Sequence, residues 1–236
     1  MNTIFERIEA VRNEIAGACM KSGRKVDEVK LIAVSKTRSA EEIIEAYRCG
    51  IRDFGENRVQ ELMKKQAEID LPINWHLIGR LQTNKVKYLP GAVSLVHSID
   101  SERLALETEK QAQKHGIILE ALCEINIAGE ASKGGLNIDT ASDEILSIVK
   151  NCPNIRIKGL MTVAPRTDVP ESNRVYFKRL KELMYEINAR LPSDKVLSEL
   201  SMGMSNDYVT AIEEGATFVR VGTAIFGARD YGENKQ

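Results

Sequence analysis

The chain has 236 residues, of which 43% are hydrophobic, and no shift in composition along it favours more than one domain. Its 33 basic and 34 acidic residues nearly cancel, which argues against a nucleic-acid or anionic-membrane partner and favours a small molecule. The first residues lack the layout of a signal peptide, and no apolar run approaches the length of a membrane span. We therefore expect one cytoplasmic domain over residues 1–236.

An amphipathic helix is expected first, within residues 1–22, because Ile4, Ile8, Val11 and Ile15 recur on one helical face. Behind it, strand-like and helix-like runs alternate. Eight strands are predicted, at residues 29–36, 51–55, 73–79, 93–98, 118–127, 155–163, 196–202 and 217–222. Helices are predicted at residues 40–49, 56–69, 83–88, 101–115, 138–151, 171–190, 206–214 and 223–228.

Strict alternation of strands and helices implies a parallel sheet, and eight such units in this length predict a closed (β/α)8 barrel, the TIM-barrel fold. A doubly wound open sheet is the alternative. Residues 231–236 have the composition of a flexible tail.

Lys36 is the most informative single residue. It closes a short apolar run rich in β-branched residues, so it lies at the carboxyl end of the first predicted strand, where α/β proteins carry their chemistry. A lysine drawn out of water there loses solvation of its ammonium form, which makes a nucleophilic amine available for Schiff-base formation. The structural alternative is a solvated lysine at a strand end.

Glycine and hydroxyl residues follow the last two predicted strands, at residues 201–206 and at Gly222 and Thr223. Loops after strands seven and eight often bind phosphate in this architecture. Ser205 or Asn206 is expected to cap the next helix, so that its first free N–H groups face an anion. These two loops, opposite a strand-terminal lysine, predict a phosphate site.

Arg220 is expected to point into the barrel. Phe218, Arg220 and Gly222 share one side of the eighth strand, and Val219 and Val221 share the other. If the valines face the helices, the guanidinium lies inside and needs acceptors. An ion pair with an acidic residue inside the barrel is the alternative.

The chain closely resembles the pyridoxal phosphate homeostasis protein family, from about residue 4 to residue 231. The resemblance is carried by residues 33–37, 54–61, 75–79, 81–85, 159–161, 201–205 and 219–227. It implies a fold-type III barrel that binds pyridoxal 5'-phosphate (PLP), similar to the N-terminal domain of alanine racemase.

The same resemblance implies the site residues. Lys36 would hold PLP as an internal aldimine, Arg220 would lie beside the pyridine nitrogen, and Asn57 would lie near the ring. The phosphate would be held by Ser201, Gly203, Met204 and Ser205 together with Gly222 and Thr223. The implied partners are PLP itself and PLP-dependent apo-enzymes that receive it.

A protein without robust catalytic turnover is expected, because an arginine beside the pyridine nitrogen disfavours its protonation and weakens the electron sink. Racemases of this fold type use a second domain with a catalytic tyrosine, which we expect this chain to lack. Two alternatives stay open. One is a weak amino-acid racemase that uses His76 or a partner's tyrosine as its base, and the other is a Schiff-base aldolase acting on a sugar phosphate.

No metal site and no further catalytic residue are predicted. The histidines, His76, His97 and His115, show no metal-ligand spacing, and His76 is better explained as a hydrogen-bonded core or rim residue than as a base. The four cysteines are scattered and are expected to be reduced thiols. We expect a monomer.

Overall fold

The computed structural model describes residues 3–130 and 133–228 of the chain; the tail predicted at residues 231–236 lies outside them. Its strands are β1 (Lys30–Val34), β2 (Asp53–Glu56), β3 (Asn74–Leu77), β4 (Leu95–Ile99), β5 (Leu119–Asn126), β6 (Leu136–Asn137), β7 (Ile155–Met161), β8 (Glu199–Met204) and β9 (Phe218–Val221). Its α-helices are α1 (Ile4–Lys21), α2 (Ala40–Arg48), α3 (Val59–Glu68), α4 (Glu102–His115), α5 (Ala141–Asn151), α6 (Arg174–Asn188), α7 (Tyr208–Glu213) and α8 (Thr223–Phe226).

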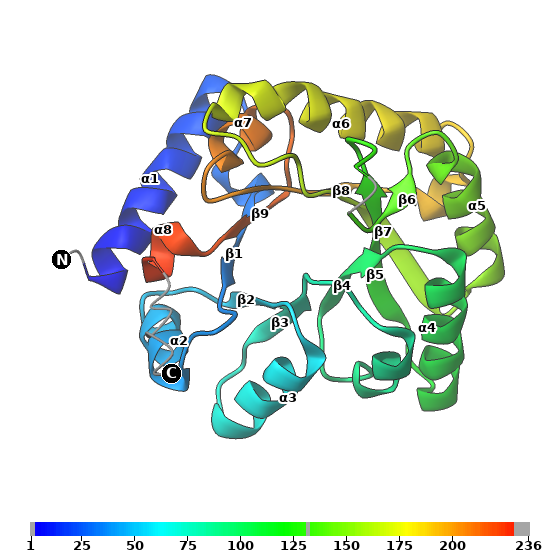
Figure 1. The fold of residues 1–236 in the computed structure, drawn as a ribbon, viewed down its shortest axis with the longest axis horizontal. Helices are drawn as coiled ribbons and strands as arrows, with labels where there is room; N and C mark the ends of the chain where they lie inside the picture. Colours follow the sequence, from blue (N-terminus) through cyan, green and yellow to red (C-terminus); the bar gives the residue numbers. More distant parts are fainter. Residues whose placement is uncertain (1–2, 131–132, 229–236) are drawn as a thin grey trace, which may run out of the picture.

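The sheet closes into a barrel, which confirms the predicted fold. Strands β4, β3, β2, β1, β9, β8, β7 and β5 are hydrogen-bonded in that order, and β4 also pairs with β5. Every pairing is parallel, and the helices form an outer ring around the strands (Figure 1). The two-residue strand β6 pairs with β5 alone and was not predicted.

Helix α1 stands outside the repeating units and packs against α2, α7 and α8 (Figure 1). It begins with a capping box, in which the Thr3 side chain accepts from Glu6 N–H and the Glu6 side chain accepts from Thr3 N–H. Its predicted apolar face is buried, including Ile8 and Ile15. Because α7 and α8 are short, α1 adds a further helix against them on the outside of the barrel.

Several predicted boundaries differ from the structure. The helix predicted at 83–88 is a 3-10 helix (Thr83–Tyr88), and the start of the helix predicted at 171–190 is a separate 3-10 turn (Pro170–Asn173). Shorter 3-10 turns cover Val26–Glu28 and Ser193–Lys195. Such tight pieces are usual in connections and carry little hydrophobic periodicity.

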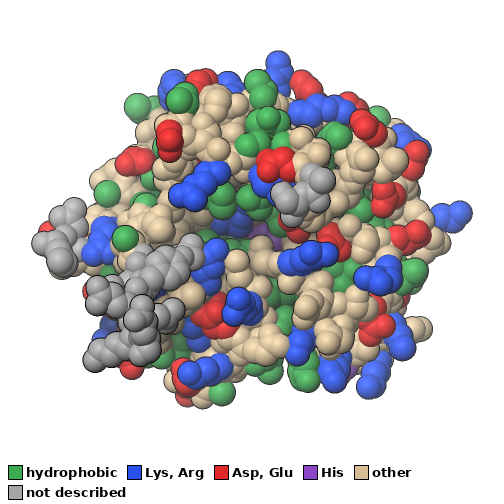
Figure 2. All heavy atoms as spheres, viewed as in Figure 1, with side chains coloured by type: hydrophobic (Ala, Val, Ile, Leu, Met, Phe, Trp, Pro, Cys, Tyr) green, Lys and Arg blue, Asp and Glu red, His purple; other side chains and the backbone are tan. Residues whose placement is uncertain are grey.

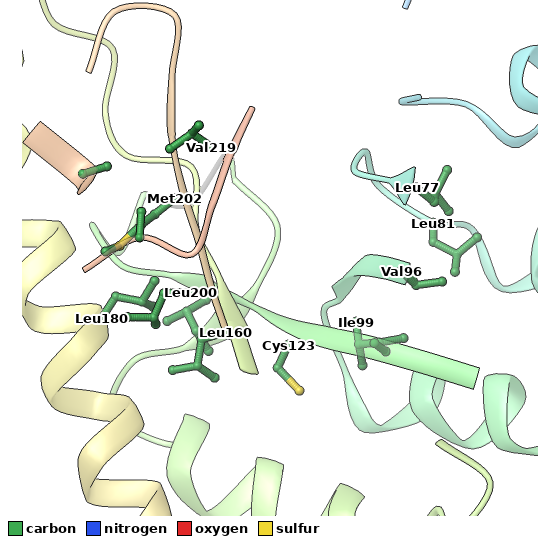
Figure 3. Packing of buried hydrophobic residues seen from close by; sticks show 14 of the residues in the cluster. Leu77, Leu81, Val96, Ile99, Cys123, Leu160, Leu180, Leu200, Met202 and Val219 are labelled. Carbon is green, nitrogen blue, oxygen red and sulfur yellow. The ribbon is translucent and has the colours of Figure 1, made fainter. Parts of the chain in front are cut away.

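The apolar core has two parts. The larger one lies between the strands and the helices, where residues such as Leu77, Ile99, Leu160 and Met202 point outward from the sheet (Figure 3). The smaller one lies inside the barrel and consists of Ile32, Leu95, Leu122, Met161 and Phe218, with Val163 against it. The rest of the interior is polar, which is where the candidate site begins.

Candidate functional site

Lys36 lies two residues past β1, at the carboxyl end of the barrel, and its side chain is half-buried. The next residue, Thr37, has a φ of 65°. A β-branched residue in the left-handed region is strained, so the surrounding contacts must hold it there. Thr37 N–H donates to Glu61 Oε1 at 2.5 Å and the Thr37 hydroxyl donates to the Lys36 carbonyl at 2.6 Å. The backbone around Lys36 is therefore fixed.

A buried ionic network lies directly behind this segment. Lys65 Nζ donates to Ser35 O, Glu56 Oε1 and Glu61 Oε1, each at 2.7 Å. The Ser35 hydroxyl donates to the same Glu56 oxygen at 2.6 Å. Burial raises the pKa of Glu56, and the bonds from Lys65 and Ser35 oppose that rise. Lys65 thus holds the strand end that carries Lys36.

The two loops predicted to bind phosphate meet each other. The Ser205 hydroxyl oxygen, behind β8, accepts from Gly222 N–H at 3.1 Å and from Ala224 N–H at 3.5 Å, behind β9. Gly222 also lies next to Val34 of β1: a Cβ built on it would be 3.4 Å from the Val34 carbonyl oxygen. The turn and Lys36 are therefore on adjacent strand ends. Figure 2 shows Lys and Arg side chains bordering a hollow in the centre of this face.

The predicted cap of the helix after β8 is wrong. The residue at the N-cap of α7 is Asp207, whose Oδ1 accepts from Met204 N–H at 2.7 Å. Ser205 instead bridges to the next loop, and Asn206 donates to Thr167 O at 3.1 Å. The Asp207 carboxylate therefore ties the end of β8 to the start of α7.

The remaining loop residues take different positions. Met204 and Thr223 are exposed at the rim. Gly203 has a φ of 88°, and a Cβ on it would lie 2.6 Å from Ala211 Cβ and 2.8 Å from Tyr208 Cα. Glycine is required there because the chain turns and α7 packs closely against it. Gly203 therefore has a structural role in addition to the phosphate contact that the resemblance implies.

Arg220 points into the barrel as predicted, and the alternative, an ion pair with an acidic residue, is not formed among the described residues. Nη1 donates to Ser201 Oγ at 2.6 Å and Nη2 donates to Thr162 O at 2.8 Å. Burial lowers the pKa of Arg220 to about 10, while the charges of Glu124 and Asp207 act to raise it. The guanidinium therefore stays charged near neutral pH.

Ser201 does not lie in the phosphate loop. It belongs to β8, its side chain is fully buried, and its hydroxyl contacts Arg220 and His97. His76 is also buried, bonded to Asp53 and His97. The interpretation of His76 as a hydrogen-bonded core residue is confirmed, and this position does not suit a catalytic base.

Asn57 follows β2 and lines a polar cavity of about 730 Å³ beside the hollow. The cavity is bordered by four cationic side chains, those of Arg58, Arg80, Lys85 and Arg103, and by the carboxylate of Asp100. Gly79 packs against the backbone of Asn57, since a Cβ on Gly79 would lie 2.5 Å from Asn57 O. Two predicted motifs, at residues 54–61 and 81–85, therefore converge on one cavity.

The donors of the site suit a phosphorylated aldehyde with a ring nitrogen. An amine stands at the end of β1, a turn of hydroxyl and N–H groups lies next to it, and a buried guanidinium lies below. Two of the five N–H groups of Arg220 have acceptors in the described part of the chain, which leaves three for a ligand.

Comparison with known proteins agrees with this geometry. The family model of the alanine racemase N-terminal domain matches residues 9–230. The pyridoxal phosphate homeostasis protein of Aquifex aeolicus is 47% identical over 227 residues, covering 96% of this chain and 98% of its own. The chain belongs to the pyridoxal phosphate homeostasis protein family.

Solved structures extend the comparison within and beyond that family. PipY of Synechococcus elongatus, solved with PLP bound, superposes with a TM-score of 0.83 at 34% identity, covering 95% of this chain and 100% of its own. An alanine racemase from Clostridium difficile superposes with a TM-score of 0.70 at 14% identity, covering 97% of this chain and 57% of its own. The latter shows a shared fold only.

Two features of this family member were not predicted: the Lys65–Glu56 pair and the His76–His97 contact. The His76–His97 contact joins two units of the barrel, whereas Lys65 and Glu56 belong to the same β2–α3 unit. Neither pair follows a spacing rule. A signal was present for the histidines, because alternation along β3 and β4 places both on the inward side, as it did for Arg220. None of the described residues form a cluster suited to a metal ion, and no described helix is long and apolar enough to span a membrane.

Proposed function

We propose that this protein binds PLP and takes part in PLP homeostasis, holding the cofactor as a Schiff base on Lys36. The observation that carries the proposal is the placement of Lys36 beside the turn of Ser205 and Gly222 on adjacent strand ends, in a chain whose relative PipY is solved with PLP bound. Bound PLP supplies an aldehyde carbon for the amine, a phosphate for the turn and a ring nitrogen for Arg220.

The proposed contacts divide among three groups. Lys36 provides the covalent attachment. The hydroxyls of Ser205 and Thr223 provide neutral donors for the phosphate, on a turn in which the Gly222 N–H holds Ser205 in place. Met204 lies at the rim, and Asn57 is placed near the ring. Gly203 shapes this loop, and Ser201 supports Arg220 from inside the barrel.

Binding without robust turnover is the second part of the proposal. Carbanion chemistry on PLP is strongest when a carboxylate stabilises a protonated ring nitrogen, and Arg220 offers a permanent donor instead. His76, the candidate base, is engaged with Asp53 and His97. Relatives named for PLP homeostasis support the same view.

The absorption spectrum of the purified protein tests PLP binding. A visible band that disappears in Lys36→Ala is expected, while Lys87→Ala, which removes an exposed lysine, should keep it. Borohydride reduction followed by peptide mapping should locate the adduct on Lys36. No visible band after incubation with PLP would contradict the proposal, and an adduct mainly on another lysine would contradict the attachment.

Two further assays separate the remaining alternatives. Single amino acids should not be racemised at a rate above that of free PLP, and measurable racemisation that requires Lys36 would favour the racemase. Transfer of PLP to a PLP-dependent apo-enzyme, measured while a trap removes free PLP, should proceed. If transfer fails under these conditions, the protein stores PLP but does not deliver it directly to apo-enzymes.

A further inference from the structure

A continuous chain of hydrogen bonds crosses the inside of the barrel and ends on Arg220. Asp53 Oδ1 lies 3.0 Å from His76 Nε2, and His76 Nδ1 lies 3.0 Å from His97 Nε2. His97 Nδ1 lies 2.9 Å from Ser201 Oγ, which accepts from Arg220 at 2.6 Å. The chain runs from the wall formed by β2, β3 and β4 to the wall formed by β8 and β9.

The chain is almost entirely shielded from water. His76 is 3% exposed, His97 and Ser201 are fully buried, and Arg220 is 4% exposed. The Phe218 ring packs edge-on against both imidazoles, with centroids 5.8 Å and 5.6 Å away. Figure 2 shows a histidine side chain at the bottom of the central hollow. Buried polar groups are costly when unpaired, and every link of this chain joins two of them.

Chemistry fixes the direction of the chain. The Asp53 carboxylate only accepts and Arg220 only donates, so with one proton on each imidazole Ser201 Oγ accepts from Arg220 and donates its own hydrogen to His97 Nδ1. His97 then donates from Nε2 to His76 Nδ1, and His76 donates from Nε2 to the Asp53 carboxylate. The reverse order would set a lone pair of His76 Nε2 against that carboxylate.

The pKa shifts of His97 and Asp53 agree with this order. Burial, together with the proximity of His76 and Arg220, holds the pKa of His97 well below its usual value, so its ring carries one proton and not two near neutral pH. Burial acts to raise the pKa of Asp53, but hydrogen bonds from His76 and Asn74 help to hold it below its usual value. Asp53 is therefore a carboxylate that can only accept.

We propose that Asp53, His76, His97 and Ser201 are positioning residues that hold Arg220 as a hydrogen-bond donor to the ring nitrogen of PLP. The inference rests on the proposed function, because it requires PLP in the pocket above Arg220. The chain occupies one N–H of the guanidinium through Ser201, and Thr162 O occupies another. With two corners fixed, the plane of the guanidinium and its remaining donors are fixed as well.

Nitrogen NMR of the cofactor-free protein tests the chain before any ligand is added. The sequence contains three histidines, and exposed His115 provides the reference signal. At pH 7.5, His76 and His97 should both carry their proton on Nε2. A proton on Nδ1 of either residue would overturn the proposed order, whatever the protein binds.

Ligand binding tests the link to the ring nitrogen. The probes are PLP and an analogue that has a C–H group in place of that nitrogen. The wild-type protein should prefer PLP by about 3- to 10-fold, the worth of one ordinary hydrogen bond. His97→Leu should lose most of this preference. His97→Asn, which keeps an acceptor for Ser201, should retain it, and His115→Leu should leave it unchanged.

The outcomes separate this inference from the proposed function. If wild-type protein binds neither probe, the proposed function fails, while the NMR result still decides the order of the chain. If PLP binds and His97→Leu keeps the full preference with an intact circular dichroism spectrum, the positioning role is wrong. If His97→Leu does not fold, Ser201→Ala breaks the same chain next to Arg220 and should lose the preference in its place.

Discussion

Replacing Lys65 with methionine should destabilise the barrel strongly, because its ammonium group satisfies three acceptors at once. Nζ lies 2.7 Å from Ser35 O, Glu56 Oε1 and Glu61 Oε1, which uses all three of its N–H groups. Lys65 is 5% exposed and Glu56 is fully buried. Removing one partner of a buried pair costs about 3–5 kcal/mol, a large share of the roughly 5–15 kcal/mol that stabilises a typical protein.

Urea unfolding at pH 7.5, followed by circular dichroism, measures this loss. Lys64→Met is the matched control, because Lys64 is the neighbour on α3, its side chain is 74% exposed, and its ion pair with Glu68 spans 3.7 Å. The control should change the free energy of unfolding by less than about 1 kcal/mol. A loss for Lys65→Met no larger than that of the control would refute the reasoning.

The loss should also depend on pH. Burial already raises the pKa of Glu56, and removing Lys65 takes away its main opposing interaction. A group whose pKa is raised by folding binds more protons in the folded state, so its cost is full above the raised, folded pKa and disappears as pH falls from there to the unfolded pKa. The difference between wild type and Lys65→Met should therefore be smaller at pH 5 than at pH 8. A difference that does not vary with pH would show that Glu56 is not the group left unpaired.

Three further changes have defined outcomes. Gly222→Val should weaken PLP binding about 10-fold or more and pyridoxal binding by less than about 2-fold, measured by titration, because a Cβ there already lies 3.4 Å from Val34 and the added methyl groups must displace the turn; Gly17→Val, with no atom within 4 Å of the added Cβ, is the control. Gly159→Ala should lose more than about 2 kcal/mol in urea unfolding, since its Cβ would lie 1.8 Å from Glu199 O; a neutral change would contradict the close strand pairing. Wild-type stability should fall by up to about 1.4 kcal/mol per pH unit below about pH 6.5 through His97, whose lowered pKa lets the unfolded state take up the proton first; equal stability at pH 7 and pH 5 would contradict this.

The barrel was predictable from the sequence because its signal is local and repeated. Each long strand is an apolar run followed by a helical period, as in β1 and β7, and regular alternation leaves few topologies. The two-residue strand β6 was missed because two residues show no period. The segment Thr83–Tyr88 was predicted as helical but is a 3-10 helix, whose tighter turn a six-residue window does not distinguish.

In the candidate site, the placement of single residues on their strands could be predicted from the sequence. The hydrogen-bond partners of side chains from distant strands could not. Lys36 and Arg220 follow from strand ends and strand parity. Ser201 was grouped with Ser205 because the two are close in sequence, yet one faces the interior and the other the adjacent loop. The contact between His97 and Ser201 joins β4 to β8 across the barrel, and no sequence spacing encodes it.

The contrast between the two buried cations explains how the proposed site holds PLP without driving its chemistry. Lys65 has its three protons committed to fixed acceptors, so it supports the backbone beside Lys36 and does not compete for the aldehyde. Arg220, with a pKa of about 10, remains a donor throughout the neutral range. A donor opposite the ring nitrogen favours the unprotonated ring, which is the weaker electron sink. In the proposed function, one cation therefore positions the attachment point and the other keeps the ring unreactive.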